Sequence, residues 1–164
     1  MKNIVVFDTS YGTFNMGDYI INECANKELQ TIIQNNFCIR IGTHTPVAHF
    51  YQLCKKRKPV KIINGAKYKF ITGTNIIKKN MCWPWPDWNV NFFNCSPYKN
   101  IILMGCGISG SFDKANWYST CLYKKILNKN YYHSTRDEKT KKYLESLGLK
   151  AINTGCPTLW SITD

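Results

Sequence analysis

The sequence predicts an α/β fold, a Rossmann-like domain of three layers with a mostly parallel sheet between two layers of helices. Short apolar runs such as residues 4–7 end in glycine-containing loops, which is typical of buried parallel strands. Most of these runs are followed by apolar residues at helical spacing, as at residues 21–33, and this alternation favours a sheet covered by helices. The chain of 164 residues can bury a core and fits a single domain, residues 1–164.

The first strand, residues 4–7, leads through a loop into a helix, and this loop carries the first candidate site. Asn15 and Asp18 both lie where the helix begins, and either side chain can cap it by accepting a hydrogen bond from a first-turn N–H group. Only one of them can be the N-cap. We therefore expect at least one of the two, beside Gly17, to contact a ligand at the positive end of the helix dipole.

Four more short elements are expected before residue 73: a strand over 37–41, a helix over 47–55 broken by Pro59, and β-like runs over 60–63 and 69–72. The last run ends at Gly73, Thr74 and Asn75. Loops at the carboxyl ends of parallel strands converge on one crevice, so these three residues are candidate ligand contacts. His44 and His49 have no acidic neighbour in the sequence and are interpreted as surface or capping residues rather than as a catalytic base.

An aromatic stretch, residues 80–98, interrupts the alternation of strands and helices. Its tryptophans Trp83, Trp85 and Trp88 are interleaved with prolines around Asp87, so the segment cannot form a long helix and is expected to be an irregular loop. Two interpretations stay open. The aromatic residues form a satellite core under a long connection, or they form a platform for sugar rings or bases, with Asp87 binding sugar hydroxyls.

Another strand that leads into glycines is expected within residues 100–110 and ends at Gly105 and Gly107. The glycine spacing departs from the dinucleotide fingerprint, so a nicotinamide site is not expected. Small residues at a strand end nevertheless let a ligand approach the backbone, which makes both glycines candidate contacts. A helix over 113–128 follows, and its inner face is expected to consist of Trp117, Cys121, Leu122 and Ile126.

The next short strand ends at Arg136 and Asp137 and is followed by a helix that Gly148 closes. Arg136 either forms a local ion pair with Asp137 or reaches an anionic ligand at the edge of the sheet. A last strand is expected over 150–153. The apolar residues 159–162 beyond it either pack on this domain or precede a second one.

The formal net charge is +12, and residues 55–79 alone hold nine cations and no acid. Such a stretch is either a solvated surface or a field that attracts phosphorylated substrates or an anionic membrane surface. Nucleic acid is not an expected partner, because only three arginines are present and no reading motif occurs.

The eight cysteines form no C-x-x-C pair and have no histidine at metal-ligand spacing, so no metal site is expected. Most are interpreted as reduced cysteines that fill core space. The sequence shows neither a signal peptide nor an apolar run long enough to span a membrane, so we expect a cytoplasmic protein.

Five segments, in this order and spacing, resemble the N-terminal half of the polysaccharide pyruvyl transferase family: GTFNMGD, KFITGTN, IILMGCGISG, STRDEKTKKYLESLG and NTGCPTLW. The more specific pair is Asn-x-Gly-Asp after the first strand and Arg-Asp-Glu at a helix start. The chain departs from the family pattern at Gly73–Thr74–Asn75, where many members have a glycine-rich triplet. It also has Cys156 where an aspartate often precedes the proline of the last motif.

The resemblance implies one half of a two-domain architecture like that of the glycosyltransferase-B fold. It implies an enzyme that transfers the enolpyruvyl unit of phosphoenolpyruvate to two hydroxyls of a saccharide, or of a lipid-linked saccharide, as a cyclic ketal. The second domain, which carries much of the basic donor site in this family, is expected to lie outside these 164 residues. No cofactor is implied, and the oligomeric state is left open.

Ketal formation needs a base, an acid and cations that hold phosphate and carboxylate groups. We expect Asp18 to orient or deprotonate an acceptor hydroxyl, Asn15 to bind the sugar and Arg136 to supply positive charge. Two alternatives remain: a glycosyltransferase of the same architecture that uses a nucleotide sugar, and a domain that binds saccharides or polyanions without catalysis.

Overall fold

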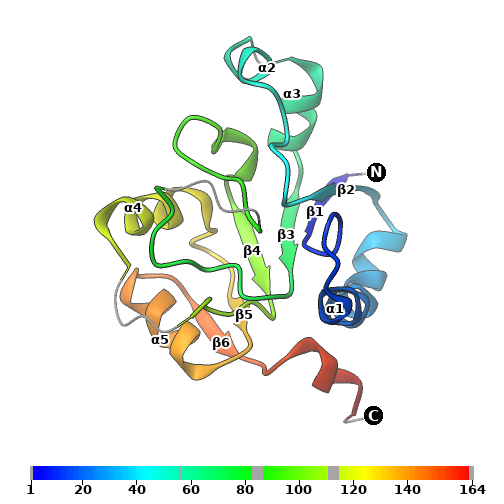
Figure 1. Cartoon of the computed structure of the whole chain (residues 1–164). Helices are drawn as coiled ribbons and strands as arrows, with labels where there is room; N and C mark the ends of the chain where they lie inside the picture. The colour runs from blue at the N-terminus through cyan, green and yellow to red at the C-terminus, as the bar shows by residue number, and fades with distance from the viewer. Residues whose placement is uncertain (1, 56, 83–86, 111–114, 163–164) are drawn as a thin grey trace.

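The structure is a computed structural model that describes residues 2–55, 57–82, 87–110 and 115–162. Its centre is a four-stranded parallel sheet in the order β2-β1-β3-β4 (Figure 1). The strands are β1 (Asn3–Asp8), β2 (Phe37–Gly42), β3 (Tyr68–Thr72) and β4 (Ile101–Met104). Two short parallel strands, β5 (His133–Thr135) and β6 (Ala151–Asn153), follow beyond β4. The predicted fold class, a Rossmann-like arrangement of helices around a parallel sheet, is confirmed.

The helices fall between these strands in the chain. They are α1 (Met16–Gln34), α2 (Phe50–Cys54), α3 (Lys58–Asn64), α4 (Trp117–Ile126) and α5 (Glu138–Ser146), with short 3-10 turns η1 (Ser96–Tyr98) and η2 (Pro157–Ile162). Among the described residues, none of these helices has the length and apolar character that crossing a bilayer requires.

Alternating side chains of the sheet enter two separate clusters, which shows the period of two expected for strands. Ile4 and Val6 of β1 face α1 and pack in a small cluster with Leu29. Val5 and Phe7 point the other way, into the main core that α3, α4 and α5 cover. The apolar run of β1 is continuous because both faces of this central strand are buried.

The junction between β4 and β5 extends the sheet past its four main strands. Gly105 donates its N–H to Ser134 Oγ at 2.9 Å, and Cys106 forms a parallel bridge with Thr135. Gly105 has φ +65°, and Pro157 packs where a side chain at this position would lie. Burial raises the pKa of the Cys106 thiol to about 12, with smaller opposing effects of the Met104 carbonyl and Arg136, so this thiol is an inert core residue.

The structure corrects two sequence interpretations. The run expected as β-like over 60–63 is helical, because Pro59 sits in the first turn of α3, where the missing N–H has no helical partner to lose. Trp117, expected on the inner face of its helix, is 78% exposed. The buried positions of α4 are Ser119, Leu122, Tyr123 and Ile126.

The end of the chain contacts the domain, although Leu159 and Ile162 remain exposed at 54% and 72%. The 3-10 turn η2 contacts α1, and Trp160 Nε1 donates a hydrogen bond to the Thr154 carbonyl at 2.8 Å. Whether a further domain follows stays a prediction.

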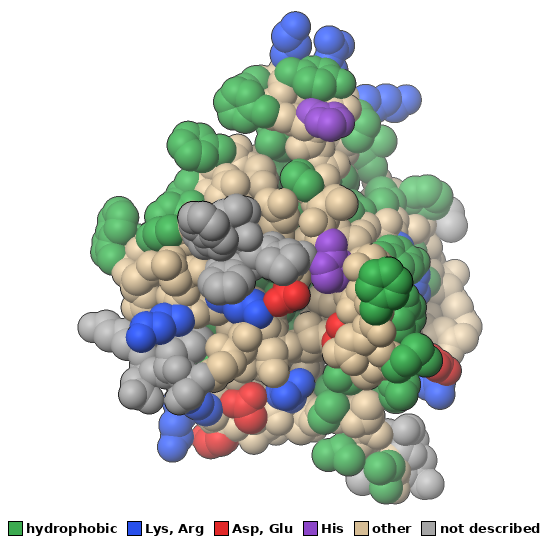
Figure 2. Space-filling view, in the orientation of Figure 1, with side chains coloured by type: hydrophobic (Ala, Val, Ile, Leu, Met, Phe, Trp, Pro, Cys, Tyr) green, Lys and Arg blue, Asp and Glu red, His purple; other side chains and the backbone are tan. Residues whose placement is uncertain are grey.

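The basic stretch 55–79 does not form one charged field. Lys and Arg side chains gather over α2 and α3 at one end of the molecule (Figure 2), where the described cations are solvated. Lys69 of β3 is only 3% exposed, and Lys78 lines a cavity described below. Lys56 lies outside the described residues. Attraction of the exposed cations of this stretch to an anionic membrane stays a prediction.

Lys69 gives a pH-dependent test of this packing. Burial, and secondarily the charge of Lys99, lowers the pKa of Lys69 to about 8 from 10.5, although its Nζ donates a hydrogen bond to the Pro97 carbonyl at 3.0 Å. Between these pH values the unfolded chain binds more protons, so the wild type gains stability as pH rises, on the order of 3 kcal/mol in total. We expect Lys69→Met to abolish this gain and to be the more stable protein at pH 7.

The measurement is urea unfolding of both proteins from pH 7 to 10.5. The difference in free energy of unfolding between the two proteins isolates the contribution of Lys69 from that of the tyrosines and cysteines that titrate in the same pH range. A difference that stays constant over this range contradicts the prediction.

Candidate functional site

The candidate site is a cavity of about 290 Å³ at the carboxyl ends of β1 and β3. The strand order reverses between these two neighbours, because β2 lies on one side of β1 and β3 with β4 on the other. Open α/β sheets bind ligands at such a switch point. The cavity is lined by Thr9, Asn15, Gly17, Asp18, Ile21, His44, Thr74, Asn75, Lys78, Asp87, Ser109 and Arg136.

Six of the residues predicted from the sequence line this cavity: Asn15, Gly17, Asp18, Thr74, Asn75 and Arg136. They come from loops that are up to 121 residues apart in the chain, between positions 15 and 136. The three remaining candidates, Gly73, Gly105 and Gly107, are not among the lining residues. Gly73 and Gly107 allow close packing around the cavity instead, and Gly105 packs against Pro157.

The start of α1 places Asp18 in the cavity. Asn15 is the N-cap, and its Oδ1 accepts a hydrogen bond from Gly17 N–H at 3.0 Å. Asp18 therefore has no capping role and accepts only a hydrogen bond from Thr13 Oγ1, at 3.1 Å, among the described residues. The carboxylate is half-buried in the first helical turn, where the helix dipole favours its negative charge. The Asn15 amino group remains available to donate to a ligand.

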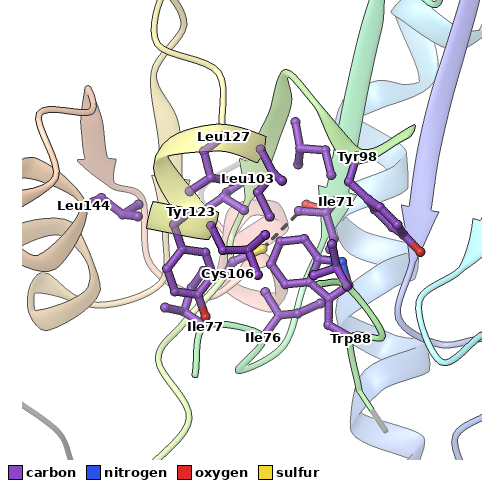
Figure 3. Packing of buried hydrophobic residues seen from close by; sticks show 14 of the residues in the cluster. Ile71, Ile76, Ile77, Trp88, Tyr98, Leu103, Cys106, Tyr123, Leu127 and Leu144 are labelled. Carbon is purple, nitrogen blue, oxygen red and sulfur yellow. Dashed lines mark hydrogen bonds between the residues drawn. The ribbon is translucent and has the colours of Figure 1, made fainter. Parts of the chain in front are cut away.

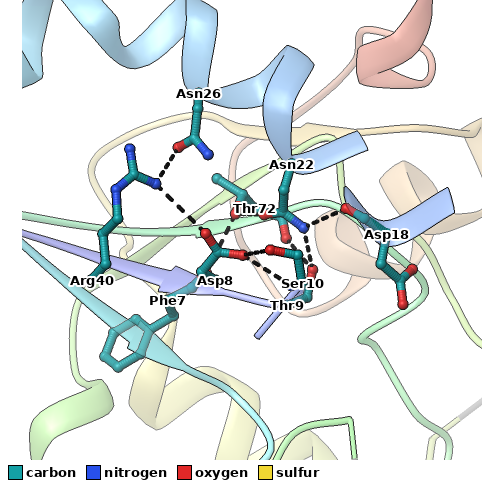
Figure 4. Close-up of polar contacts among 9 residues, drawn as sticks. All are labelled: Phe7, Asp8, Thr9, Ser10, Asp18, Asn22, Asn26, Arg40 and Thr72. Atoms are coloured by element: carbon teal, nitrogen blue, oxygen red, sulfur yellow. Dashed lines mark hydrogen bonds and ion pairs between the residues drawn. The ribbon is translucent and has the colours of Figure 1, made fainter. Parts of the chain in front are cut away.

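A buried polar network forms the floor beneath this turn (Figure 4). Asp8, at the end of β1, accepts hydrogen bonds from Ser10 N–H at 2.9 Å and Ser10 Oγ at 2.5 Å. Its other oxygen lies 3.5 Å from Arg40 Nη1, and Arg40 also donates to Asn26 Oδ1 at 2.9 Å. Because Asp8 is engaged on both oxygens and only 3% exposed, it shapes the loop rather than facing a ligand.

Asn22 joins the helix to the ends of two strands. Its amino group donates to Thr9 Oγ1 at 2.8 Å and to the Asp18 carbonyl at 2.9 Å, and its Oδ1 accepts from Thr72 Oγ1. The side chain is 2% exposed. This one amide therefore fixes the turn that carries Asp18 against β1 and β3.

We expect Asn22→Ala to lower the free energy of unfolding by about 2–4 kcal/mol, because it leaves buried hydroxyl and carbonyl groups without their partner. Chemical denaturation followed by circular dichroism measures the loss. Asn26→Ala is the matched control, since Asn26 lies one turn later on α1 and makes an exposed hydrogen bond to Arg40. Equal losses in the two variants contradict the role given to Asn22.

Two glycines bring the walls of the cavity together. At Gly73, which has φ +68°, a Cβ atom would lie 2.5 Å from Ile21 Cγ2 of α1. At Gly107 it would lie 2.5 Å from Asn75 Oδ1 and 2.8 Å from Arg136 Cδ and Nε. Only glycine lets α1 and the Asn75 and Arg136 side chains approach this closely.

Thr74 is held in a conformation that L residues rarely adopt, with φ 53°. Its carbonyl accepts a hydrogen bond from Gly107 N–H at 2.9 Å, and Ile77 then bridges Ile108 in parallel. A β-branched residue in the left-handed region is strained, and such strain persists where surrounding contacts fix the backbone, often at functional sites.

Lys78 and Asp87 add charges that the sequence did not single out as a pair. Lys78 Nζ lies 2.6 Å from Asp87 Oδ2 and donates to Ser109 Oγ at 2.9 Å. The Lys78 side chain is 12% exposed and that of Asp87 is 45% exposed. In the sequence Lys78 is one of the nine cations of residues 55–79. The pairing of Ile77 with Ile108 brings it to the cavity.

His44 is partly exposed and also lines the cavity, so it is a surface residue that faces the candidate site. Its Nε2 lies 3.2 Å from the Thr9 carbonyl, a contact from the end of β2 to the end of β1. His49 is the exposed N-cap residue of α2, as expected. The signal that distinguishes the two is position: His44 follows a strand end closely and His49 does not.

Arg136 does not form the local ion pair that its neighbour suggested. Asp137 is the N-cap of α5 and accepts hydrogen bonds from Thr140 N–H at 2.7 Å and Thr140 Oγ1 at 2.9 Å. The Arg136 guanidinium bonds to none of the described residues and lines the cavity. The second interpretation, an arginine that faces a ligand, is the one compatible with this geometry.

The aromatic stretch divides into parts with different surroundings. Trp88 is fully buried in the main core, with its ring centroid 6.4 Å from that of Tyr123 (Figure 3). This confirms the core interpretation for Trp88. Trp83 and Trp85 lie outside the described residues.

The formal charges of the lining balance. Lys78 and Arg136 face Asp18 and Asp87, and no group of three or more His, Cys, Asp or Glu within the described ranges could hold a metal ion. The arrangement offers a carboxylate for proton transfer or hydroxyl orientation, together with a guanidinium and amide groups that can hold a polar ligand.

The comparisons with known proteins assign a family. No curated protein and no solved structure gives a significant match. The model of the polysaccharide pyruvyl transferase family, a family of transferases, matches residues 15–164. This range includes every site residue predicted from the sequence. The chain therefore belongs to the polysaccharide pyruvyl transferase family.

Proposed function

We propose that this protein transfers a pyruvyl unit from phosphoenolpyruvate to a saccharide hydroxyl pair and that the cavity at the switch point holds the acceptor. The observation that carries the proposal is the placement of Asp18, a carboxylate without a capping role, opposite Arg136 in one cavity of a chain that belongs to this family. The acceptor is a saccharide or a lipid-linked saccharide.

The balanced charge of the lining supports the acceptor assignment. Two cations face two carboxylates, and one cation, Lys78, is already paired with Asp87. A donor with phosphate and carboxylate groups needs an excess of positive charge, whereas sugar hydroxyls need hydrogen-bonding groups of both kinds. Arg136 is the described lining cation best placed to face a donor group from this side.

The residues then take distinct roles in the reaction. Asp18 accepts a proton from the attacking hydroxyl, or orients it, as the hydroxyl oxygen bonds to the carbon that carries the phosphate ester. The electron pair of the enol double bond takes up one proton at the methylene carbon, which becomes the methyl group of the ketal, and the proton of the second hydroxyl leaves with phosphate. The Asn15 amino group and the amide of Asn75 hold neighbouring hydroxyls. Phosphate leaves as the second hydroxyl closes the ketal, and Arg136 stabilises the negative charge.

The test is incubation of the protein with phosphoenolpyruvate and a panel of saccharide and lipid-linked saccharide acceptors. Release of inorganic phosphate that depends on the acceptor, with a gain in acceptor mass equal to one pyruvyl ketal, supports the proposal. Release of nucleotide from a sugar nucleotide instead would indicate a glycosyltransferase. Saccharide binding without either release would leave a binding domain, and both of these results overturn the proposal.

A further inference from the structure

A second hollow is lined by residues from two segments, 45–53 and 89–94. These segments closely follow His44 and Asp87, which line the cavity. The second hollow has a volume of about 830 Å³, within the roughly 300–1,000 Å³ of ligand clefts. We call it the amide groove. It is lined by Thr45, Pro46, Val47, Ala48, His49, Phe50, Gln52, Leu53, Asn89, Asn91, Phe93 and Asn94.

The amide groove is continuous with the cavity along the chain. His44 and Asp87 line the cavity, and Thr45 and Asn89 line the groove. The two segments are held side by side, because Asn89 N–H donates to the Thr43 carbonyl at 3.1 Å. The two hollows are therefore lined by adjacent parts of the same two segments.

The chemistry of the groove differs from that of the rest of the surface. No Asp, Glu, Lys or Arg is among its lining residues, although the chain carries a net charge of +12. The Asn89 side chain and the Asn91 amino group bond to none of the described residues. The aromatic residues Phe50 and Phe93 are 66% and 81% exposed, respectively.

We propose that the amide groove binds the neutral sugar units next to the one that receives the pyruvyl group. This rests on the proposed function. Carboxamides donate to and accept from hydroxyls, and exposed aromatic rings pack against the C–H faces of sugar rings. The lining itself carries no Asp, Glu, Lys or Arg, so hydrogen bonds and packing on the rings, rather than ion pairs within the groove, would hold a ligand there.

The local structure makes the groove rigid enough for this role. Asn94 Oδ1 accepts from Asn91 N–H at 2.7 Å, and its amino group donates to the Asn89 carbonyl at 3.1 Å. Gln52 Oε1 accepts from His49 N–H at 2.8 Å on the opposite side. Trp88 packs in the main core and so fixes the segment between Asp87 of the cavity and Asn89 of the groove.

The first experiment needs no donor. The protein is applied to an array of neutral and acidic glycans, and neutral ligands of one to six units are then titrated by calorimetry. We expect retention of neutral glycans and at least a tenfold gain in affinity between one and three or four units. Retention of acidic glycans alone, or of no glycan, overturns the groove.

The second experiment assigns the gain to the groove. Phe93→Ala and Phe50→Ala are expected to remove the gain in affinity with chain length. Tyr132→Ala is the matched control, because Tyr132 is a 65% exposed aromatic residue after α4 and outside the groove. A length dependence that survives in both phenylalanine variants overturns the proposal.

The two proposals fail separately. Length-dependent glycan binding without phosphate release from phosphoenolpyruvate overturns the transferase mechanism and leaves the groove in place. Phosphate release in the presence of glycans whose affinity does not depend on length supports the transferase and overturns the groove.

Discussion

Asp18→Asn is expected to lower kcat/KM for pyruvyl transfer by a factor of about 10²–10⁴, the range that general acid–base groups contribute. The amide has the shape of the carboxylate and can still accept the hydrogen bond from Thr13 Oγ1, but it cannot take a proton. The loss of stability should stay below about 1 kcal/mol, since a first-turn carboxylate contributes about that much through the helix dipole.

Acceptor-dependent phosphate release and thermal unfolding measure the two effects. Glu23→Gln is the matched control, because Glu23 lies on the same helix with a 73% exposed side chain and a 3.8 Å ion pair to Lys27. This variant should retain wild-type transfer. Undiminished activity in Asp18→Asn would remove Asp18 from the mechanism.

Gly107→Ala is expected to lower transfer by a factor of about 10–100 with little change in stability. The added methyl group would lie 2.8 Å from Arg136 Cδ and Nε and 2.5 Å from Asn75 Oδ1, so both side chains must shift. A misplacement of about 1 Å in a positioning group can cost 10²-fold in rate. Both side chains face the cavity, into which they can move without disturbing the core.

A double-mutant cycle with Arg136→Ala tests this explanation. If Gly107→Ala acts by displacing the guanidinium, adding it to Arg136→Ala should cause little further loss. Independent, multiplying losses would show that Gly107 acts through something else. The thermal midpoint of Gly107→Ala distinguishes a displaced side chain from a damaged fold.

The sheet could be predicted from the sequence because its strands are central and carry their own signal. β1 and β3 are central and largely buried, and each ends at a polar, glycine-bearing loop. The apolar run is continuous in β1, whereas β3 carries Lys69 within it. The convergence of loops at a switch point then follows from the topology of parallel sheets. This is why six predicted contacts do line one cavity.

Interpretations based on residues adjacent in the sequence were wrong where one of those residues has another role in a helix. The sequence predicts a β-like run after Pro59, yet Pro59 occupies the first turn of α3. Of the two interpretations of Arg136, the ion pair with Asp137 is absent from the part of the chain that the structure describes, because that carboxylate caps α5. In both cases the position within a helix decided the outcome, and helix boundaries are what sequence patterns define least well.

The remaining site residues were missed because their partners are distant in the chain. Lys78 follows β3, and it contacts Asp87 and Ser109 of later segments only in the folded structure. His44 touches Thr9, which is 35 residues earlier. No pattern within a short window contains these pairs.

The burial of Trp88 separates what keeps the protein folded from what it recognises. Its two neighbours, Asp87 and Asn89, face different hollows, while the indole between them belongs to the core. Under the two proposals, substitutions at Asp87 or Asn89 are expected to change acceptor preference while the packing of Trp88 stays intact. Acceptor preference can therefore diverge among related proteins while the same tryptophan continues to anchor the chain.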